Sequence, residues 1–81
     1  MSKVGTAFEA FDWRDPGRKV RTPDVMALFG DGPESFDDAW AGIAALMRRG
    51  HIATVHVSTR FRTDSWMVLT ALGYVAQKGS A

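Results

Sequence analysis

The side chains best suited to catalysis or metal binding lie in the second half of the chain. His51 and His56 are five positions apart, so in a strand they would point to opposite faces and could not share a metal. His56 and Ser58 would share a face near Asp64, but no oxyanion donor or pocket is evident beside them. We therefore expect no catalytic residue, no metal site and no cofactor.

Sequence motifs of common enzyme classes are also missing. The chain contains no nucleophile elbow, Walker loop, zinc-protease motif or dinucleotide fingerprint. The glycine-rich segment Gly30-Asp31-Gly32 carries an acid that would repel a phosphate. The sequence therefore predicts a binding protein rather than an enzyme.

Charged side chains are the remaining functional candidates, and they are unevenly distributed. The net charge is only +1, too small to indicate a polyanionic partner by itself. Residues 14–21 carry four basic side chains and one acid, and Arg60 and Arg62 add positive charge, whereas residues 31–38 carry four acids and no base. The binding partner that the sequence predicts therefore depends on whether the fold brings the basic clusters or the acidic cluster together on one surface.

The size and composition of the chain indicate one small globular domain. It has 81 residues, of which 46% are apolar, and we expect a single domain over 1–81 with an ordered core at about 4–76 and a tail at 77–81. Cysteine is absent, so disulfides and thiolate metal sites are excluded. The sequence shows no stretch of signal-peptide or membrane-span character, so a cytoplasmic protein is expected.

Two short helices are predicted in the first half. The first is expected to begin at Thr6, which forms a capping box with Glu9, and to end at 15–17 (Asp-Pro-Gly). Residues 18–21 form an extended link with room for one brief strand. The second helix is expected to begin with Thr22 as N-cap, followed by proline, and to end at Gly30.

A third helix is predicted between Ser35, which caps it together with Asp38, and the terminal segment Arg48-Arg49-Gly50. Its large residues recur at helical spacing and are expected to face the core. They are Phe36, Trp40, Ile43, Ala44 and Met47. The small residues Ala41, Gly42 and Ala45 would allow a neighbouring backbone to approach closely.

From His51 onward the apolar pattern changes to alternation, which predicts a β-hairpin. A turn at Thr63-Asp64 would pair Phe61 with Trp66. It would also pair Val55 with Leu72 and Ala53 with Tyr74, and would form one apolar face from Ala53, Val55, Val57, Phe61, Trp66, Val68, Leu72 and Tyr74. The alternative is a helix from Asp64 to Leu72, capped by Thr63 and ended by Gly73.

Two segments carry a resemblance to a known superfamily. The segment TPDVMALFG resembles the second helix of winged helix-turn-helix proteins, and DDAWAGIAALMRRGHI is similar to the end of their third helix and the start of their first wing strand. The resemblance implies an α+β fold of three short helices followed by a β-hairpin. It also implies a small domain that binds double-stranded DNA and regulates transcription.

The resemblance implies a DNA interface made by the start of the second helix and by the basic wing. Its expected residues are Arg18, Lys19, Arg21, Thr22, Arg60 and Arg62. The start of the third helix would face the major groove, but there the sequence departs from the pattern, because acids repel the DNA backbone. These acidic residues are Asp31, Glu34, Asp37 and Asp38.

The same acidic residues support an alternative function. A protein–protein interaction module or inhibitor could present them to a basic protein partner, and complementary charge would give fast, selective association. A symmetric homodimer is also compatible with the sequence, although no heptad pattern indicates it.

Overall fold

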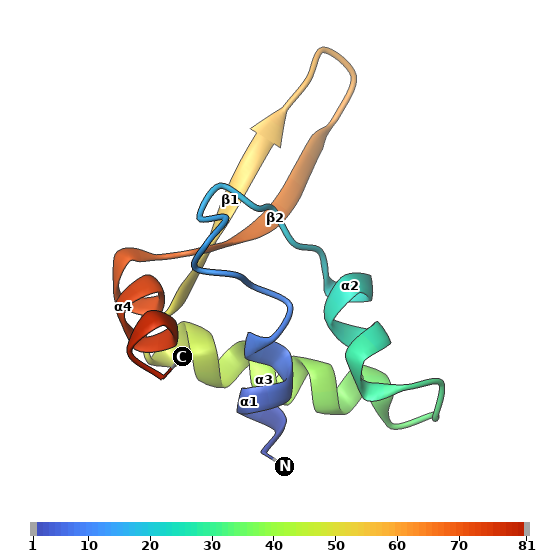
Figure 1. The fold of residues 1–81 in the computed structure, drawn as a ribbon. Helices are drawn as coiled ribbons and strands as arrows, with labels where there is room; N and C mark the ends of the chain where they lie inside the picture. The colour runs from blue at the N-terminus through green and yellow to red at the C-terminus, as the bar shows by residue number, and fades with distance from the viewer. Residues whose placement is uncertain (1, 81) are drawn as a thin grey trace.

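The structure, a computed structural model that describes residues 2–80, is an α+β fold in which helices precede a two-stranded antiparallel hairpin (Figure 1). Its elements are α1 (Lys3–Phe8), α2 (Thr22–Met26), the 3-10 helix η1 (Ala27–Phe29), α3 (Ser35–Arg48), β1 (Ile52–Ser58), β2 (Thr63–Leu69) and α4 (Ala71–Gly79). The predicted α+β class is therefore confirmed, and α4 adds a helix after the hairpin.

Helix α1 begins earlier in the chain than the capping box predicts. The Oγ atom of Ser2 accepts a hydrogen bond from the backbone N–H of Gly5, so Ser2 is the N-cap. Thr6 lies inside the helix, is buried, and donates its hydroxyl to the Ser2 carbonyl. The predicted start at Thr6 is therefore wrong, because the earlier Ser2 already caps the first turn through the Gly5 N–H.

Helix α2 begins within one residue of the prediction. Arg21 is its N-cap, and the Asp24 carboxylate accepts a hydrogen bond from the Arg21 backbone N–H. The helical segment continues through η1 and ends, as expected, at Gly30, whose φ of 91° requires glycine.

Helix α3 spans the predicted residues but is capped differently. Glu34 is the N-cap and makes no side-chain cap, while the Asp38 carboxylate forms an ion pair with the Lys3 ammonium at 3.1 Å. The cap predicted from Ser35 and Asp38 is therefore wrong, because Asp38 is held by α1. The helix ends before Gly50, whose φ is 73°.

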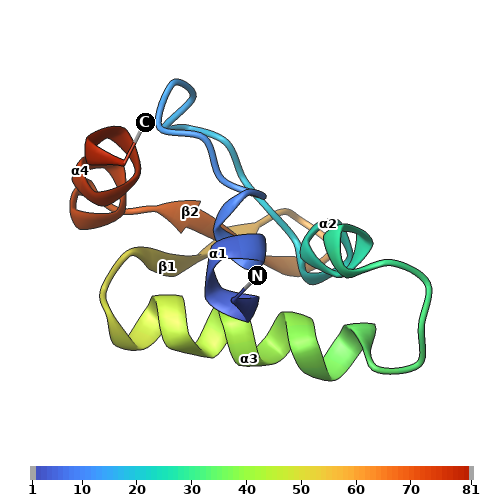
Figure 2. The ribbon, with the colours of Figure 1, turned by 60° about the horizontal axis from the view of Figure 1, so that its bottom comes forward.

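The core lies where α1, α2 and the hairpin base meet one side of α3 (Figure 2). Ile43, Leu46 and Val25 are the largest fully buried side chains. Gly42 allows the close contact between α1 and α3, since a Cβ there would lie 2.6 Å from the Lys3 carbonyl oxygen. The predicted role of Gly42 in close backbone approach is thus confirmed.

One side of α3 carries three large apolar residues that were expected in the core but are partly exposed. Phe36, Trp40 and Met47 are 51%, 42% and 36% exposed. The inward side is formed mainly by small residues and two aliphatic ones, namely Ala39, Gly42, Ile43, Ala45 and Leu46. The core assignment of the three large residues is therefore wrong, because α1 packs too closely against α3 to leave room for them.

The hairpin is present, but its register differs from the prediction. Trp66 pairs with Val55 rather than with Phe61, and Ile52 pairs with Leu69. The turn is residues 59–62, closed by a hydrogen bond from the Thr59 N–H to the Arg62 carbonyl at 2.7 Å. Phe61 therefore lies in the turn with 90% of its surface exposed, and the predicted turn at Thr63-Asp64 is wrong.

The face of the hairpin that meets the core is also different. Ile52, Met67 and Leu69 are buried, whereas the residues of the predicted apolar face within the strands are half-buried or exposed. These are Ala53, Val55, Val57, Trp66 and Val68. The brief strand expected in residues 18–21 is present as a bridge between Val20 and Met67.

Helix α4 begins after the hairpin. The alternative helix over 64–72 is therefore wrong, because residues 64–69 belong to strand β2. Thr70 is its N-cap and accepts a hydrogen bond from the Gly73 N–H. Leu72 and Tyr74 were expected in a strand but lie in α4. Residues 77–79 of the expected tail also lie in α4, and Ala81 lies outside the described residues.

None of the helices in residues 2–80 has the length and apolar character that a membrane-spanning helix needs.

Candidate binding surfaces

The tip of the hairpin is the most projecting part of the molecule and lies away from the helices (Figure 1). Arg60 and Arg62 flank Phe61 in the turn, and all three are exposed. The turn is rigid at its base, because the Thr59 hydroxyl donates to the Arg62 carbonyl and accepts from the Arg62 N–H. The two arginines of the predicted wing therefore lie in the turn between β1 and β2 rather than in a strand.

Asp64 holds two of the predicted DNA-binding arginines at the side of the hairpin. One carboxylate oxygen lies 3.1 Å from Arg62 Nε and the other 3.4 Å from Arg21 Nη2. The Arg21 guanidinium also stacks 4.2 Å from the centre of the Trp66 ring. Sequence reasoning missed this role of Asp64, although the alternation in β2 already places Asp64 and Trp66 on the same face.

The other basic candidates lie elsewhere. Arg18 and Lys19 are exposed in the loop before the Val20 bridge, and Arg18 Nε is 4.0 Å from Asp15. Figure 2 shows this loop and α3 on opposite sides of the hairpin base. The structure therefore does not bring Arg18 and Lys19 onto the surface formed by α3.

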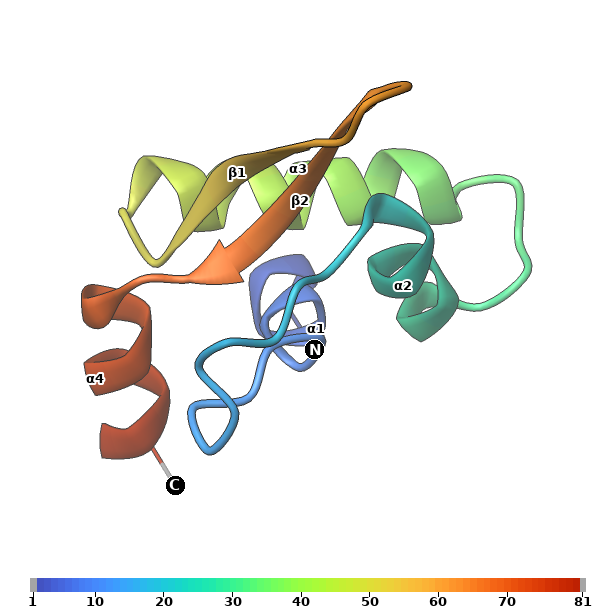
Figure 3. The same cartoon turned by 90° about the horizontal axis from the view of Figure 1, so that it is seen from above.

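Thr22 lies on the α3 side, in a groove of about 100 Å³ between α3 and the hairpin. Trp40 and Met47 line it from α3, and Thr54 and Ser65 line it from the hairpin. Figure 3 shows the hairpin crossing over α3 on its way to the tip. The groove is therefore apolar on its helix side and bears hydroxyl groups on its hairpin side.

The acidic candidates remain near the start of α3. Asp31, Glu34 and Asp37 are exposed, whereas Asp38 is half-buried and paired with Lys3. Phe36 is exposed in the same turn. The start of α3 is thus an acidic surface with an aromatic side chain, and three of the four predicted acids remain accessible.

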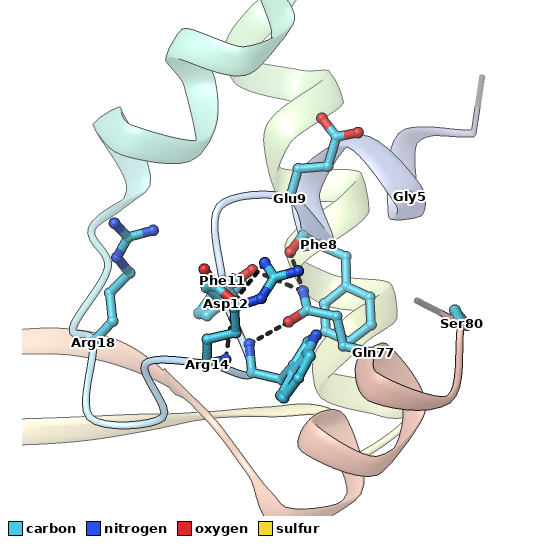
Figure 4. A pocket seen from close by; sticks show the side chains of 10 residues that line it. Gly5, Phe8, Glu9, Phe11, Asp12, Arg14, Arg18, Gln77 and Ser80 are labelled. Carbon is cyan, nitrogen blue, oxygen red and sulfur yellow. Dashed lines mark hydrogen bonds and ion pairs between the residues drawn. The ribbon is translucent and has the colours of Figure 1, made fainter.

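A depression of about 510 Å³ lies between the end of α1, the following loop and α4, and Gln77 lines it (Figure 4). The Gln77 side-chain amide donates to the carbonyls of Phe8 and Phe11 and accepts from the Trp13 N–H. These three hydrogen bonds fasten α4 to the loop. Gln77 therefore has a structural role there, which sequence analysis missed by placing it in the tail.

The residues examined for catalysis do not form a cluster. His56 Nδ1 is 3.0 Å from Ser65 Oγ, and Ser58 Oγ is 3.1 Å from Thr63 Oγ1, so each is engaged across the hairpin. Asp64 pairs with Val57, which places it on the opposite face. His51 stacks against Phe8 with ring centres 5.5 Å apart.

Comparison with known proteins adds no relative. The chain matches no protein-family model, no curated protein sequence and no solved structure.

Proposed function

We propose that this chain is a small regulatory domain of the winged-helix type that binds double-stranded DNA through its hairpin. The observation that carries this proposal is the projecting turn with exposed Arg60 and Arg62 at its tip. The order of elements supports it, because a helix, a brief strand at Val20, two helices and a hairpin follow one another as in winged helices. Fold alone does not give function, so the arginines are the testable part.

The arginines would bind the phosphate backbone. Arg62 is paired with Asp64 while its side chain is 70% exposed, so a phosphate oxygen can replace or join the carboxylate at modest cost. Arg60 has no ion pair among the described residues. Trp66 and Asp64 would keep Arg21 against the hairpin, where it supports the wing.

This mode of binding is expected to have little base specificity. The exposed side of α3 is aromatic and acidic, whereas base reading in the major groove requires side chains that can approach the DNA without charge repulsion. Arg18 and Lys19 remain outside the proposed contact, because the loop before Val20 that carries them lies across the hairpin base from α3 (Figure 2).

Replacing both tip arginines tests the proposal. For Arg60→Ala with Arg62→Ala, we expect weaker binding of labelled random duplex DNA, and a salt dependence shallower by about 1.8, since each phosphate contact contributes about 0.9 to the slope of log affinity against log salt. The measurement is fluorescence anisotropy across a salt series.

A matched control removes the same charge elsewhere. Arg14 and Lys78 both lie over the Trp13 ring, away from the hairpin, so Arg14→Ala with Lys78→Ala should keep the wild-type slope. Equal losses in the two double variants would show that only net charge matters. Absence of wild-type binding at low salt would reject the proposal.

A second candidate is a protein-binding module that presents the acidic start of α3 to a basic partner. The exposure of Asp31, Glu34 and Asp37 beside Phe36 favours it, because an aromatic residue rimmed by charge is typical of protein interfaces.

Charge reversal at Asp31 and Glu34 tests whether the start of α3 lies at the DNA interface or is left for a protein partner. If α3 faces the DNA, Asp31→Lys with Glu34→Lys should tighten duplex binding several-fold by removing repulsion. If the acidic surface is reserved for a protein, DNA affinity should change little in the same anisotropy assay. Both residues are exposed and make no ion pair within residues 2–80, so the fold should be retained.

A further inference from the structure

The side of α3 that borders the hairpin at Trp40 and Met47 carries a continuous apolar row, which residues 2–80 leave partly exposed. We call it the α3 stripe: Phe36, Trp40, Ala44 and Met47. The rings of Phe36 and Trp40 meet edge to face, with centres 6.2 Å apart. At 1.5 Å rise per residue the stripe is about 16 Å long, which is enough for one helix-to-helix contact.

Charges of opposite sign flank the two ends of this stripe. Asp37 and Arg48 are both exposed, and eleven residues separate them. At about 100° per residue, positions eleven apart lie within about 20° of each other around the helix, so both flank the same side of the stripe. The acid lies beside Phe36 at the start of the helix, and the base lies beside Met47 at its end.

We propose that the α3 stripe packs against the α3 stripe of a second copy of this chain, with the two helices antiparallel about a two-fold axis. In that arrangement Phe36 meets the second copy's Met47, and Trp40 meets the second copy's Ala44. Asp37 meets the second copy's Arg48, and the symmetry repeats each contact. The proposal goes beyond DNA binding and does not depend on it.

The sequence of the stripe explains why a second copy fits better than another ligand. The Trp40 ring opposite the second copy's Ala44 methyl group gives complementary shape. A two-fold interface also requires that one surface supply both members of every pair, and the stripe does so. The antiparallel arrangement also opposes the helix dipoles favourably. A basic peptide would match Asp37 but would be repelled at Arg48, and DNA would be repelled at Asp37.

The dimer is expected to be weak, because one helix stripe buries less than the roughly 800 Å² per partner that is typical of stable complexes. We therefore expect dissociation in the micromolar range. Sedimentation equilibrium from about 1 to 500 µM at low salt would measure it over the range in which such a complex forms.

Charge exchange between the two flanking residues tests the register. Asp37→Arg and Arg48→Asp should each weaken dimerisation at least tenfold, because each places like charges opposite one another. The double variant, Asp37→Arg with Arg48→Asp, should return to within about threefold of wild type, because it restores both pairs in reverse. Glu9→Arg makes the same change of charge on an exposed residue outside α3 and should leave the dimer unchanged.

Circular dichroism of each variant would confirm that the fold is retained, as expected for exposed positions. A wild-type protein that is monomeric throughout the concentration range would overturn the proposal. So would a dimer that is indifferent to both single changes, or one that the double change does not restore. A monomer whose α3 instead binds a basic amphipathic peptide would assign the stripe to a different protein.

Discussion

Gly73→Ala should destabilise the protein by about 3 kcal/mol, at the upper end of the usual cost of overpacking. A Cβ at this position would lie 2.0 Å from the His51 carbonyl oxygen and 2.7 Å from Leu69 Cδ1. The first atom belongs to the backbone, so rotation of a side chain cannot relieve the clash. Urea unfolding followed by circular dichroism would show a midpoint far below that of wild type.

Gly79→Ala provides the control within the same helix. No atom lies within 4 Å of a Cβ at Gly79, and alanine is a better helix former by about 0.5–1 kcal/mol. Its unfolding midpoint should therefore equal or exceed that of wild type. Similar losses in the two variants would mean that α4 does not contact the turn before β1 as described.

The expected size of this effect follows from how α4 is attached. The Thr70 N–H donates to the His51 carbonyl, and the Gly73 N–H donates to the Thr70 hydroxyl. At the other end of α4, Gln77 binds the loop that follows α1. A helix held at both ends by specific hydrogen bonds cannot shift to admit a methyl group without losing several of them.

The hairpin illustrates how far alternation can determine a β-structure. Alternation correctly indicated two strands, and Val55 and Trp66 do share a face. The predicted register differs from the observed one by an even number of residues. In either register, therefore, the same side chains of the two strands share a face of the hairpin. The choice between them depends on the turn, where the Thr59 hydroxyl and the Arg62 backbone form hydrogen bonds that a hydropathy pattern does not contain.

Which face of the hairpin is buried also depends on tertiary contacts. Both faces carry apolar residues near the base, with Ile52 and Leu69 on one and Val68 on the other. The chain enters β1 through Gly50, whose positive φ sets the direction of the strand relative to α3. That geometry places Ile52 in the core.

In the helices, too, local sequence determines some features and tertiary contacts determine others. The extent of α3 follows from its period and from Gly50, and both were predictable. The orientation of its faces was not, because Gly42 allows α1 to approach so closely that the small side of the helix is the buried one. Packing therefore leaves Phe36, Trp40 and Met47 partly exposed, whereas the sequence pattern alone assigned them to the core.

The two arginines that pair with Asp64, Arg21 and Arg62, show a similar limit. Their charge was evident from the sequence, but their pairing was not. Asp64 joins Arg62 to Arg21, whose side chains are 70% and 43% exposed respectively. This arrangement requires the observed hairpin register and the Val20 bridge together. Neither the register nor the bridge can be predicted from the local sequence.

Leu46→Ala and Met47→Ala should differ sharply although the residues are adjacent in α3. Leu46 is fully buried in the core, so its truncation should lower the free energy of unfolding by about 2–5 kcal/mol through lost contacts and a residual cavity. Met47 is 36% exposed in the α3 stripe, and its truncation should cost less than about 1 kcal/mol. The measurement is urea unfolding at about 1 µM, where the proposed dimer is dissociated.

The pair determines the orientation of α3, because adjacent positions on a helix are about 100° apart. A large loss for both residues would indicate that the stripe is covered within a single chain, which would remove the surface on which dimerisation depends. A larger loss for Met47 than for Leu46 would indicate a helix rotated from the position described. The expected pattern, a large loss at Leu46 and a small one at Met47, leaves the stripe free for a partner.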